Sequence, residues 1–266
     1  MATNKTPIKL SSTELEELRA AKQLLESPGL AAKISSFVGS PIEKGFALLP
    51  KQWSTVVNDA TRKAIESALS VALWTMNGAK AGAPSNWWHK IAASASGAAG
   101  GAFGLAALTV ELPVSTTIML RSIADIARSE GEDLKLAEAR LECIQILALG
   151  GNSNRDDGTE IGYFAARAAM AKAVSEAAAH FAAQGVTQHG TPAVVRLITQ
   201  IAARFSIVVS EKAAAQAVPV VGAIGGAVIN TLFIDHFQDM ARGHFIVRRL
   251  ERKYGQALVE QHYVEL

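Results

Sequence analysis

Two sets of polar residues recur at helical spacing, and their side chains are of the types that bind polar ligands or take part in reactions. The first set is Thr117, Arg121, Asp125 and Arg128, and the second is Thr231, Asp235, Asp239 and Arg242. Neighbours within a set are three or four positions apart, so each set forms a stripe along one side of a helix. Because an unpaired buried charge is costly, we interpret the two stripes as a paired ionic network. In that network Arg121 meets Asp235 or Asp239, and Asp125 meets Arg242. A site for a polar ligand or a reacting group is the alternative.

The second stripe also offers candidate metal ligands, because His236 lies between Asp235 and Asp239 and His244 follows on the same segment. His236 and Asp239 are neighbours on a helix, whereas His244 lies more than two turns further along. A tetrahedral site needs ligands that converge on one point. We therefore predict no metal site here.

Motifs of common enzyme classes are missing from the chain, including HExxH, GxSxG, the P-loop and the dinucleotide fingerprint. We accordingly predict no cofactor and no catalytic residue, and we favour a protein that is not an enzyme. Cys143 is the single cysteine and lies in an apolar helical segment. This setting is typical of an inert buried thiol in a reducing compartment.

Two uncharged glycine-rich stretches, Ile91–Val110 and Ala213–Ile234, precede the two polar stripes. Each is about as long as a helix that spans a bilayer, roughly 20 residues. Glycines four positions apart, such as Gly222 and Gly226, let a second backbone approach closely in lipid or in protein. We expect Pro113 to interrupt the helix just beyond the first stretch and Pro219 to open the second as a new helix. Whether these segments lie inside protein or lipid stays open at this point.

An all-α fold is predicted, because alanine dominates the apolar composition and no alternating strand pattern of useful length occurs. Overlapping capping boxes, Ser11 with Glu14 and Thr13 with Glu16, predict a helix from about Thr13 to Glu26. Further helices are expected over residues 52–77, 136–149, 161–184 and 192–217 and, after the second glycine-rich stretch, in a basic segment that ends near Gly255.

The segments Thr117–Glu130 and Thr231–His244 share Thr, Asp, Ala and Arg at matching positions. We therefore predict a single helical domain in which two pseudo-repeated glycine-rich helical hairpins pack together. The expected organisation is an N-terminal helix and linker over residues 1–50, the helical domain over 51–255, and a C-terminal tail over 256–266.

Candidate contacts with a membrane surface are aromatic and basic, and they are Trp87, Trp88, Arg248, Arg249, Arg252 and Lys253. Tryptophan favours the headgroup zone, and clustered cations are attracted to anionic lipids. The net charge of +2 argues against a nucleic-acid partner. The amino terminus has no apolar signal core, so we expect a cytoplasmic protein with peripheral contact at the inner membrane.

Several segments are similar to the EcsC protein family, and they run from about Gly97 to Gly255. They read GAAGGAFG, VELPVSTTIMLRSIADIARSEGEDL, ARLECIQILALGG, GYFAARAAMAKA and VPVVGAIGGAVINTLFIDHFQDMARGHFIVRRLERKYG. The resemblance implies a bacterial helical protein in a membrane or transport context. The founding member of the family is encoded beside components of an ABC-type transporter that affects secretion and competence. The resemblance implies no active site.

These observations lead to three hypotheses. The first is a membrane-associated helical accessory protein that regulates or assists a transporter or secretion process by protein contact. The second is a hydrolase that uses Asp125, Asp235, His236 and Asp239 in a cleft between the hairpins. The third is a soluble helical protein that binds a lipid or another apolar ligand. Expected partners are a membrane surface or a transporter component, and the sequence does not predict the oligomeric state.

Overall fold

The computed structural model describes residues 9–39, 42–75, 104–150, 162–184, 191–218 and 222–266. Within these ranges all regular structure is helical, which confirms the prediction of a single all-α domain. The helices are α1 (Ser12–Leu25), α2 (Leu30–Val38), α3 (Glu43–Leu48), α4 (Trp53–Thr75), α6 (Gly104–Ser129), α7 (Ala137–Leu149), α8 (Gly162–Gln184), α9 (Pro192–Ala217), α10 (Gly222–Tyr254) and α11 (Gln256–Glu265).

The helix α1 begins with the predicted capping box. Ser11 Oγ accepts a hydrogen bond from the Glu14 backbone amide, and the Glu14 carboxylate accepts one from the Ser11 amide at 3.0 Å. Two amides of the first turn, which have no partner inside the helix, are therefore satisfied by side chains. Of the two overlapping boxes in the sequence, it is the Ser11 box that starts α1.

Pro113 does not interrupt the chain as expected, because α6 continues through it from Gly104 to Ser129. A proline inside a helix removes one backbone hydrogen bond and costs about 3 kcal/mol. Packing outweighs this cost, because α4 lies along α6, and Leu108 and Leu112, which precede the proline in α6, are buried. Thr117 Oγ1 also donates to the Pro113 carbonyl at 2.8 Å.

The second glycine-rich stretch is divided between two helices. Residues 213–217 form the last turn of α9, which confirms the helix expected over 192–217, and α10 starts at Gly222. From there α10 continues for 33 residues to Tyr254, about 50 Å at 1.5 Å per residue. The basic segment is therefore the end of α10 and not a separate helix. Gly255, with φ of 86°, ends α10 and leads into α11.

The described glycines that permit close helix contacts include Gly45 and Gly243, which are not among those spaced four residues apart. A Cβ on Gly45 of α3 would collide with the Ala214 carbonyl of α9. A Cβ on Gly243 of α10 would lie 2.6 Å from Leu25 Cγ of α1. By contrast, a Cβ on Gly226 would have no described atom within 4 Å. Residues 91–103 lie outside the described part of the chain, so the first hairpin and the pseudo-repeat stay predictions.

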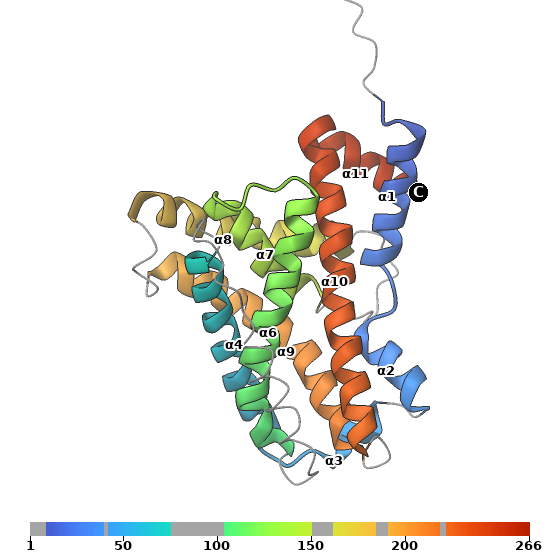
Figure 1. The fold of residues 1–266 in the computed structure, drawn as a ribbon, viewed down its shortest axis with the longest axis vertical. Coiled ribbons are helices and arrows are strands. Elements are labelled where there is room, and N and C mark those ends of the chain that lie inside the picture. Colours follow the sequence, from blue (N-terminus) through green and yellow to red (C-terminus); the bar gives the residue numbers. More distant parts are fainter. Residues whose placement is uncertain (1–8, 40–41, 76–103, 151–161, 185–190, 219–221) are drawn as a thin grey trace, which may run out of the picture.

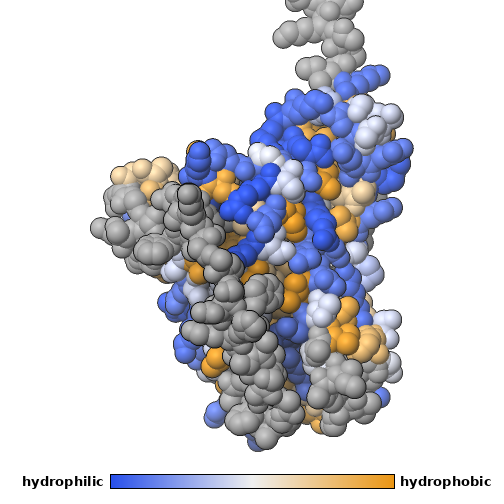
Figure 2. Space-filling view, viewed as in Figure 1, coloured by the Kyte–Doolittle hydropathy of each residue, from blue (hydrophilic) through white to orange (hydrophobic). Residues whose placement is uncertain are grey.

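The long helix α10 runs from the bottom to the top of the molecule in Figure 1, with α1 beside its upper half and α6 beside its other side. At the bottom, α3 and the starts of α6 and α10 meet the end of α9, an arrangement we call the α3 end. At the top, α1, α11, the second half of α10 and the α6–α7 turn form the α11 end. Figure 2 shows hydrophilic side chains gathered over the α11 end, whereas orange side chains are interspersed below.

The C-terminal segment 256–265 forms α11, which packs on α10 and α1. Its Tyr263 is fully buried and stacks on Tyr163 of α8, with ring centroids 6.0 Å apart. The helices α1 and α11, which are far apart in the sequence, therefore lie in contact at this end. The division at residues 50 and 255 stays a prediction.

Candidate functional site: a buried polar network along α10

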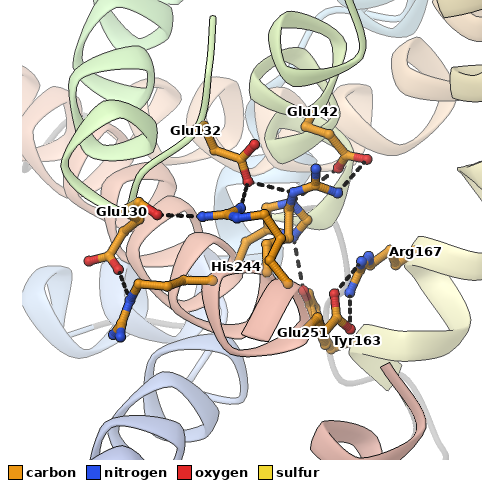
Figure 3. A network of polar contacts seen from close by, with 10 residues as sticks. Glu130, Glu132, Glu142, Tyr163, Arg167, His244 and Glu251 are labelled. Atoms are coloured by element: carbon orange, nitrogen blue, oxygen red, sulfur yellow. Dashed lines mark hydrogen bonds and ion pairs between the residues drawn. The ribbon is translucent and has the colours of Figure 1, made fainter. Parts of the chain in front are cut away.

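His244 is at the centre of a buried polar network at the α11 end (Figure 3). Its side chain is completely buried, and both ring nitrogens have partners. Tyr163 Oη lies 2.9 Å from Nδ1, and Glu142 Oε2 lies 3.1 Å from Nε2. These three residues come from α8, α10 and α7, so tertiary packing assembles the group.

The partners determine which nitrogen of His244 carries the proton. A carboxylate can only accept, so Nε2 bears the hydrogen that is donated to Glu142. In the neutral ring Nδ1 is then an acceptor, and the Tyr163 hydroxyl donates to it. Burial lowers the pKa of His244 and outweighs the opposing effect of the Glu142 carboxylate. The contact is therefore a hydrogen bond from a neutral imidazole and not an ion pair.

Glu142 keeps its charge despite its burial. Burial by itself raises the pKa of this carboxyl group, but the His244 hydrogen bond and the positive charges of Arg248 and Arg167 outweigh it. The net effect is a pKa below the ordinary value. Arg248 Nη1 contacts Glu142 Oε1 at 3.1 Å, and Arg248 Nε donates to Glu132 Oε1 at 2.8 Å.

The α6–α7 turn positions the next acids of the network. Gly131 adopts a φ of 80°, its amide donates to Arg128, and the Glu132 amide donates to Ala127. This is the Schellman arrangement that commonly ends helices. It presents Glu130 and Glu132 on either side of the glycine, facing three arginines of α10. Arg252 contacts the Glu132 carboxylate and also donates to the Glu130 carbonyl at 2.5 Å.

A second bridge ties α8 to α10. Arg167 donates from both terminal nitrogens to Glu251, at 2.8 and 2.7 Å. Such paired bonds match the planar geometries of guanidinium and carboxylate. Burial works to lower the pKa of Arg167, but the bonds to Glu251 and the nearby acids raise it. The network thus contains charges that are buried, paired and bonded in defined directions.

Chemically, this arrangement is better suited to holding helices than to catalysis. In the relay from Tyr163 through His244 to Glu142, every polar atom named above is occupied by a protein partner. Burial also raises the pKa of the Tyr163 hydroxyl well above its usual range, so it remains protonated. A general base or nucleophile needs an atom within reach of a substrate. Here the hydroxyl, ring-nitrogen and carboxylate atoms of these residues are bonded to other side chains.

The four predicted basic membrane contacts belong to the same end of the molecule and are paired with acids. Arg249 bonds to Glu130 at 2.7 Å and to Glu17 of α1 at 3.0 Å. Lys253 Nζ bonds to Glu14 at 2.6 Å. Arg248 and Arg252 bond to the acids described above. Their attraction to anionic lipid is therefore weakened by neighbouring carboxylates, and membrane contact through them stays a prediction.

Glu14 both caps α1 and bonds to residues at the end of α10. Besides capping α1, its carboxylate accepts hydrogen bonds from Lys253 and from Tyr254 Oη, the latter at 2.6 Å. The bonds from Lys253, Tyr254 and Ser11 hold the pKa of Glu14 well below its usual range. The capping box predicts only the local bond, whereas the long-range partners come from the end of α10.

The stripe residues do not form the expected network across the two helices. Asp125 is 75% exposed and pairs with Arg128 of its own helix at 2.6 Å, and Arg242 pairs with Asp239 at 3.1 Å. The predicted pair between Asp125 and Arg242 is therefore wrong, because both ionic edges face outward. The helices α6 and α10 do pack together, and Gln238 Nε2 donates to Ser122 Oγ at 2.9 Å.

The remaining stripe residues differ in exposure. Thr117 is buried and bonded to its own backbone, whereas Arg121, Thr231 and Asp235 are exposed. Asp239 also approaches Lys33 of α2 at 3.4 Å.

His236 is buried and faces away from the exposed acids. Its Nε2 donates to the Gly150 carbonyl at 2.9 Å, and burial lowers its pKa. The residues of the hydrolase hypothesis, Asp125, Asp235, His236 and Asp239, therefore do not converge on one point. Among the described residues, no group of three or more His, Cys, Asp or Glu side chains is placed to hold a metal ion.

Trp87 and Trp88 lie outside the described residues. Cys143 is buried within α7, and burial raises the pKa of its thiol far above the usual range. This agrees with the inert thiol that the apolar context predicts.

A second buried site, which the sequence reasoning did not identify, lies near the α3 end. Lys212 of α9 is 0% exposed, and its Nζ bonds to Glu111 of α6 at 2.7 Å and to Asn230 of α10 at 3.0 Å. The ring of Phe233 lies 4.6 Å from the same nitrogen. The sequence does contain a signal, because Glu111 ends the first uncharged stretch and Lys212 precedes the second.

The fold and this pattern of buried charges can now be compared with known proteins. The sequence profile of the EcsC protein family matches residues 12–250. The chain belongs to the EcsC protein family. Searches among curated proteins and among solved structures each returned no match. The match extends from α1 into the last turns of α10, so it includes His244, Glu142 and the Lys212 site, and it ends before Glu251, Arg252 and α11.

Proposed function

We propose that this EcsC-family protein is a cytoplasmic α-helical accessory protein that associates peripherally with the inner membrane. In this role it regulates or assists a transporter or a secretion process by protein contact. The observation that carries the proposal is the separation of the two ends of the bundle. Both ends expose large apolar side chains, among them Val110 at the α3 end and Leu136 at the α11 end, but the network of paired charges described above lies at the α11 end.

The state of the buried charges favours peripheral association over a stable transmembrane arrangement. By length and composition, α9 is the one helix among the described residues that could cross a membrane, with a mean hydropathy of 1.5. However, α9 packs against α3, α4, α7 and α8 and carries the buried Lys212. Core helices of water-soluble bundles have the same composition. Insertion of α9 into lipid would require the bundle to come apart and the Lys212 ion pair to be broken.

Scaffolding also accounts for the occupied state of the His244 network. A protein that acts by contact needs a rigid arrangement of helices, and buried bonded charges specify one arrangement at the expense of others. The Asp and His residues of the hydrolase hypothesis lie apart, as described above. We therefore place the function on the surface of the bundle and not in its interior.

Fractionation of cells that produce the tagged protein at its native level tests the proposal. We expect the protein in the membrane fraction, and we expect carbonate at high pH to release it, because peripheral proteins lose their contacts without dissolving the bilayer. Chemical crosslinking before lysis is expected to capture an integral membrane protein together with it. A protein that is wholly soluble at low and at high salt, with no crosslinked membrane protein, would contradict the proposal. Retention after carbonate would contradict its peripheral part.

A further inference from the structure

We propose that α3 and the turn that follows it form a docking surface for an anionic lipid bilayer. The inference rests on the proposed function and deepens it by assigning the membrane contact to residues that the sequence analysis did not select. We define the α3 surface as Lys44, Phe46, Leu48, Lys51 and Trp53, together with the neighbouring Phe37 of α2.

The α3 surface exposes apolar side chains that the bundle leaves without cover. Leu48 is 54% exposed, and Phe37 at the end of α2 is exposed to a similar degree. On the same segment, Phe46 and Trp53 are half-buried and pack on each other, with ring centroids 5.6 Å apart. Tryptophan with an apolar body and a polar edge is enriched at the level of lipid headgroups.

The surface is held firmly on the bundle. Gly45 lies against the backbone of Ala214 in α9, and even a methyl group at this position would collide with that backbone. Two residues before Ala214, Lys212 bonds to Glu111 of α6 and to Asn230 of α10. The first contact joins α3 to α9, and the bonds of Lys212 join α9 to α6 and α10. Because Val110 precedes Glu111, a further exposed apolar residue lies at the same end.

The charges around the α3 surface select an anionic bilayer. Lys44 and Lys51 are exposed and make no ion pair with a described residue, and the acid beside them is Glu43. The acids at the opposite end of the molecule, including Glu14, Glu130 and Glu132, are paired with basic side chains of α10. Lys44 and Lys51 differ from those basic side chains, because no described acid takes up their charge before a negatively charged surface does. Lysines at the rim of an apolar patch can reach the headgroups while Leu48 enters the acyl boundary.

Vesicle cosedimentation with the full chain tests the inference. The probes are vesicles of phosphatidylcholine alone and vesicles that also contain phosphatidylglycerol. We expect binding to the anionic vesicles and at least tenfold weaker binding for Leu48→Glu. The matched control is Leu136→Glu, because Leu136 is 59% exposed but lies at the α6–α7 turn. The control is expected to bind within twofold of the unmodified chain.

The lysines are tested separately, with Lys44→Gln and Lys51→Gln combined. Each cation near an anionic surface contributes about fivefold in binding, which corresponds to about 1 kcal/mol. The double variant should therefore bind anionic vesicles about 25-fold more weakly. The control is Lys172→Gln on the exposed face of α8, which should leave binding unchanged. Circular dichroism checks that each variant is folded.

Each contrary outcome is distinct. Equal binding of Leu48→Glu and Leu136→Glu would overturn the assignment to α3. Equal binding to both kinds of vesicle would overturn the selection of anionic lipid. A chain that binds neither vesicle, yet is found in the membrane fraction of cells, would show recruitment by a protein. In that case this inference fails while the proposed function stands.

Discussion

The buried ion pair of Lys212 and Glu111 makes an asymmetric prediction about stability. The Lys212 side chain is 0% exposed, whereas that of Glu111 is 36% exposed. Loss of Glu111 therefore leaves an ammonium group inside the protein without its counter-ion. Loss of Lys212 leaves a carboxylate that can turn toward water. The two substitutions break the same 2.7 Å contact, but we expect very different costs.

For Glu111→Ala we expect a loss of about 3 kcal/mol in the free energy of unfolding, which is the lower end of the range for an uncompensated buried charge. The lower end applies because water can enter the space that the carboxylate leaves. For Lys212→Met we expect a loss within about 1 kcal/mol, because methionine keeps the apolar stem and its contact with the ring of Phe233. The double variant should be more stable than Glu111→Ala alone, since no buried charge remains.

Urea unfolding followed by circular dichroism measures all four proteins, with the slope of each transition compared to confirm that the same surface is exposed. The double-mutant cycle then isolates the interaction of the two side chains. A Lys212→Met variant that is as unstable as Glu111→Ala would refute the reasoning. So would a double variant no more stable than Glu111→Ala.

Three further predictions concern the glycine contacts and the histidines. Gly243→Ala should destabilise the protein by about 1–3 kcal/mol, because the new methyl group would collide with α1. Gly226→Ala should instead raise the melting temperature, because alanine is favoured over glycine within helices by about 1 kcal/mol. Tyr163→Phe should cost about 1–3 kcal/mol in chemical unfolding, because it leaves the buried Nδ1 of His244 without a donor, and an unchanged midpoint would contradict the assigned tautomer. Burial lowers the pKa of His236 and His244 below 6.5. On acidification the unfolded chain therefore binds protons at these histidines before the folded chain does. At pH values under about 6.5, the free energy of unfolding should decrease by up to about 1.4 kcal/mol per pH unit for each histidine. In His236→Gln, whose Nε2 can still donate to the same carbonyl, this slope should be roughly halved, and a stability that rises on acidification would contradict the sign.

Much of the helix content could be predicted because its causes are local. The Ser11 capping box and Pro192 at the start of α9 depend on residues within one turn of the helix end. The buried face of α4 likewise follows from apolar residues at three- and four-residue spacing, among them Ala60 and Ala64. These features survive folding because backbone geometry alone brings such positions together.

The wrong predictions of helix boundaries have a non-local cause, which is packing between helices. Pro113 ends a helix by local rules, yet packing against α4 holds α6 together through it. The basic segment that ends near Gly255 reads as a separate helix, but it is the last part of α10. The pattern of apolar residues predicts that a segment is buried, but it does not predict which helix packs against it.

By itself the sequence determined the all-α class, most helix boundaries and membership of the EcsC family. The partners of the charged residues were decided by tertiary structure. Arg248 and Glu132 are 116 positions apart, and Lys253 and Glu14 are 239 apart. Spacing along a helix can place charges on one face, but the choice between water, a neighbour on the same helix and a distant acid depends on how the helices pack. That packing left most of the predicted stripe residues exposed, and it paired the predicted basic cluster with acids of α1, the α6–α7 turn and α7.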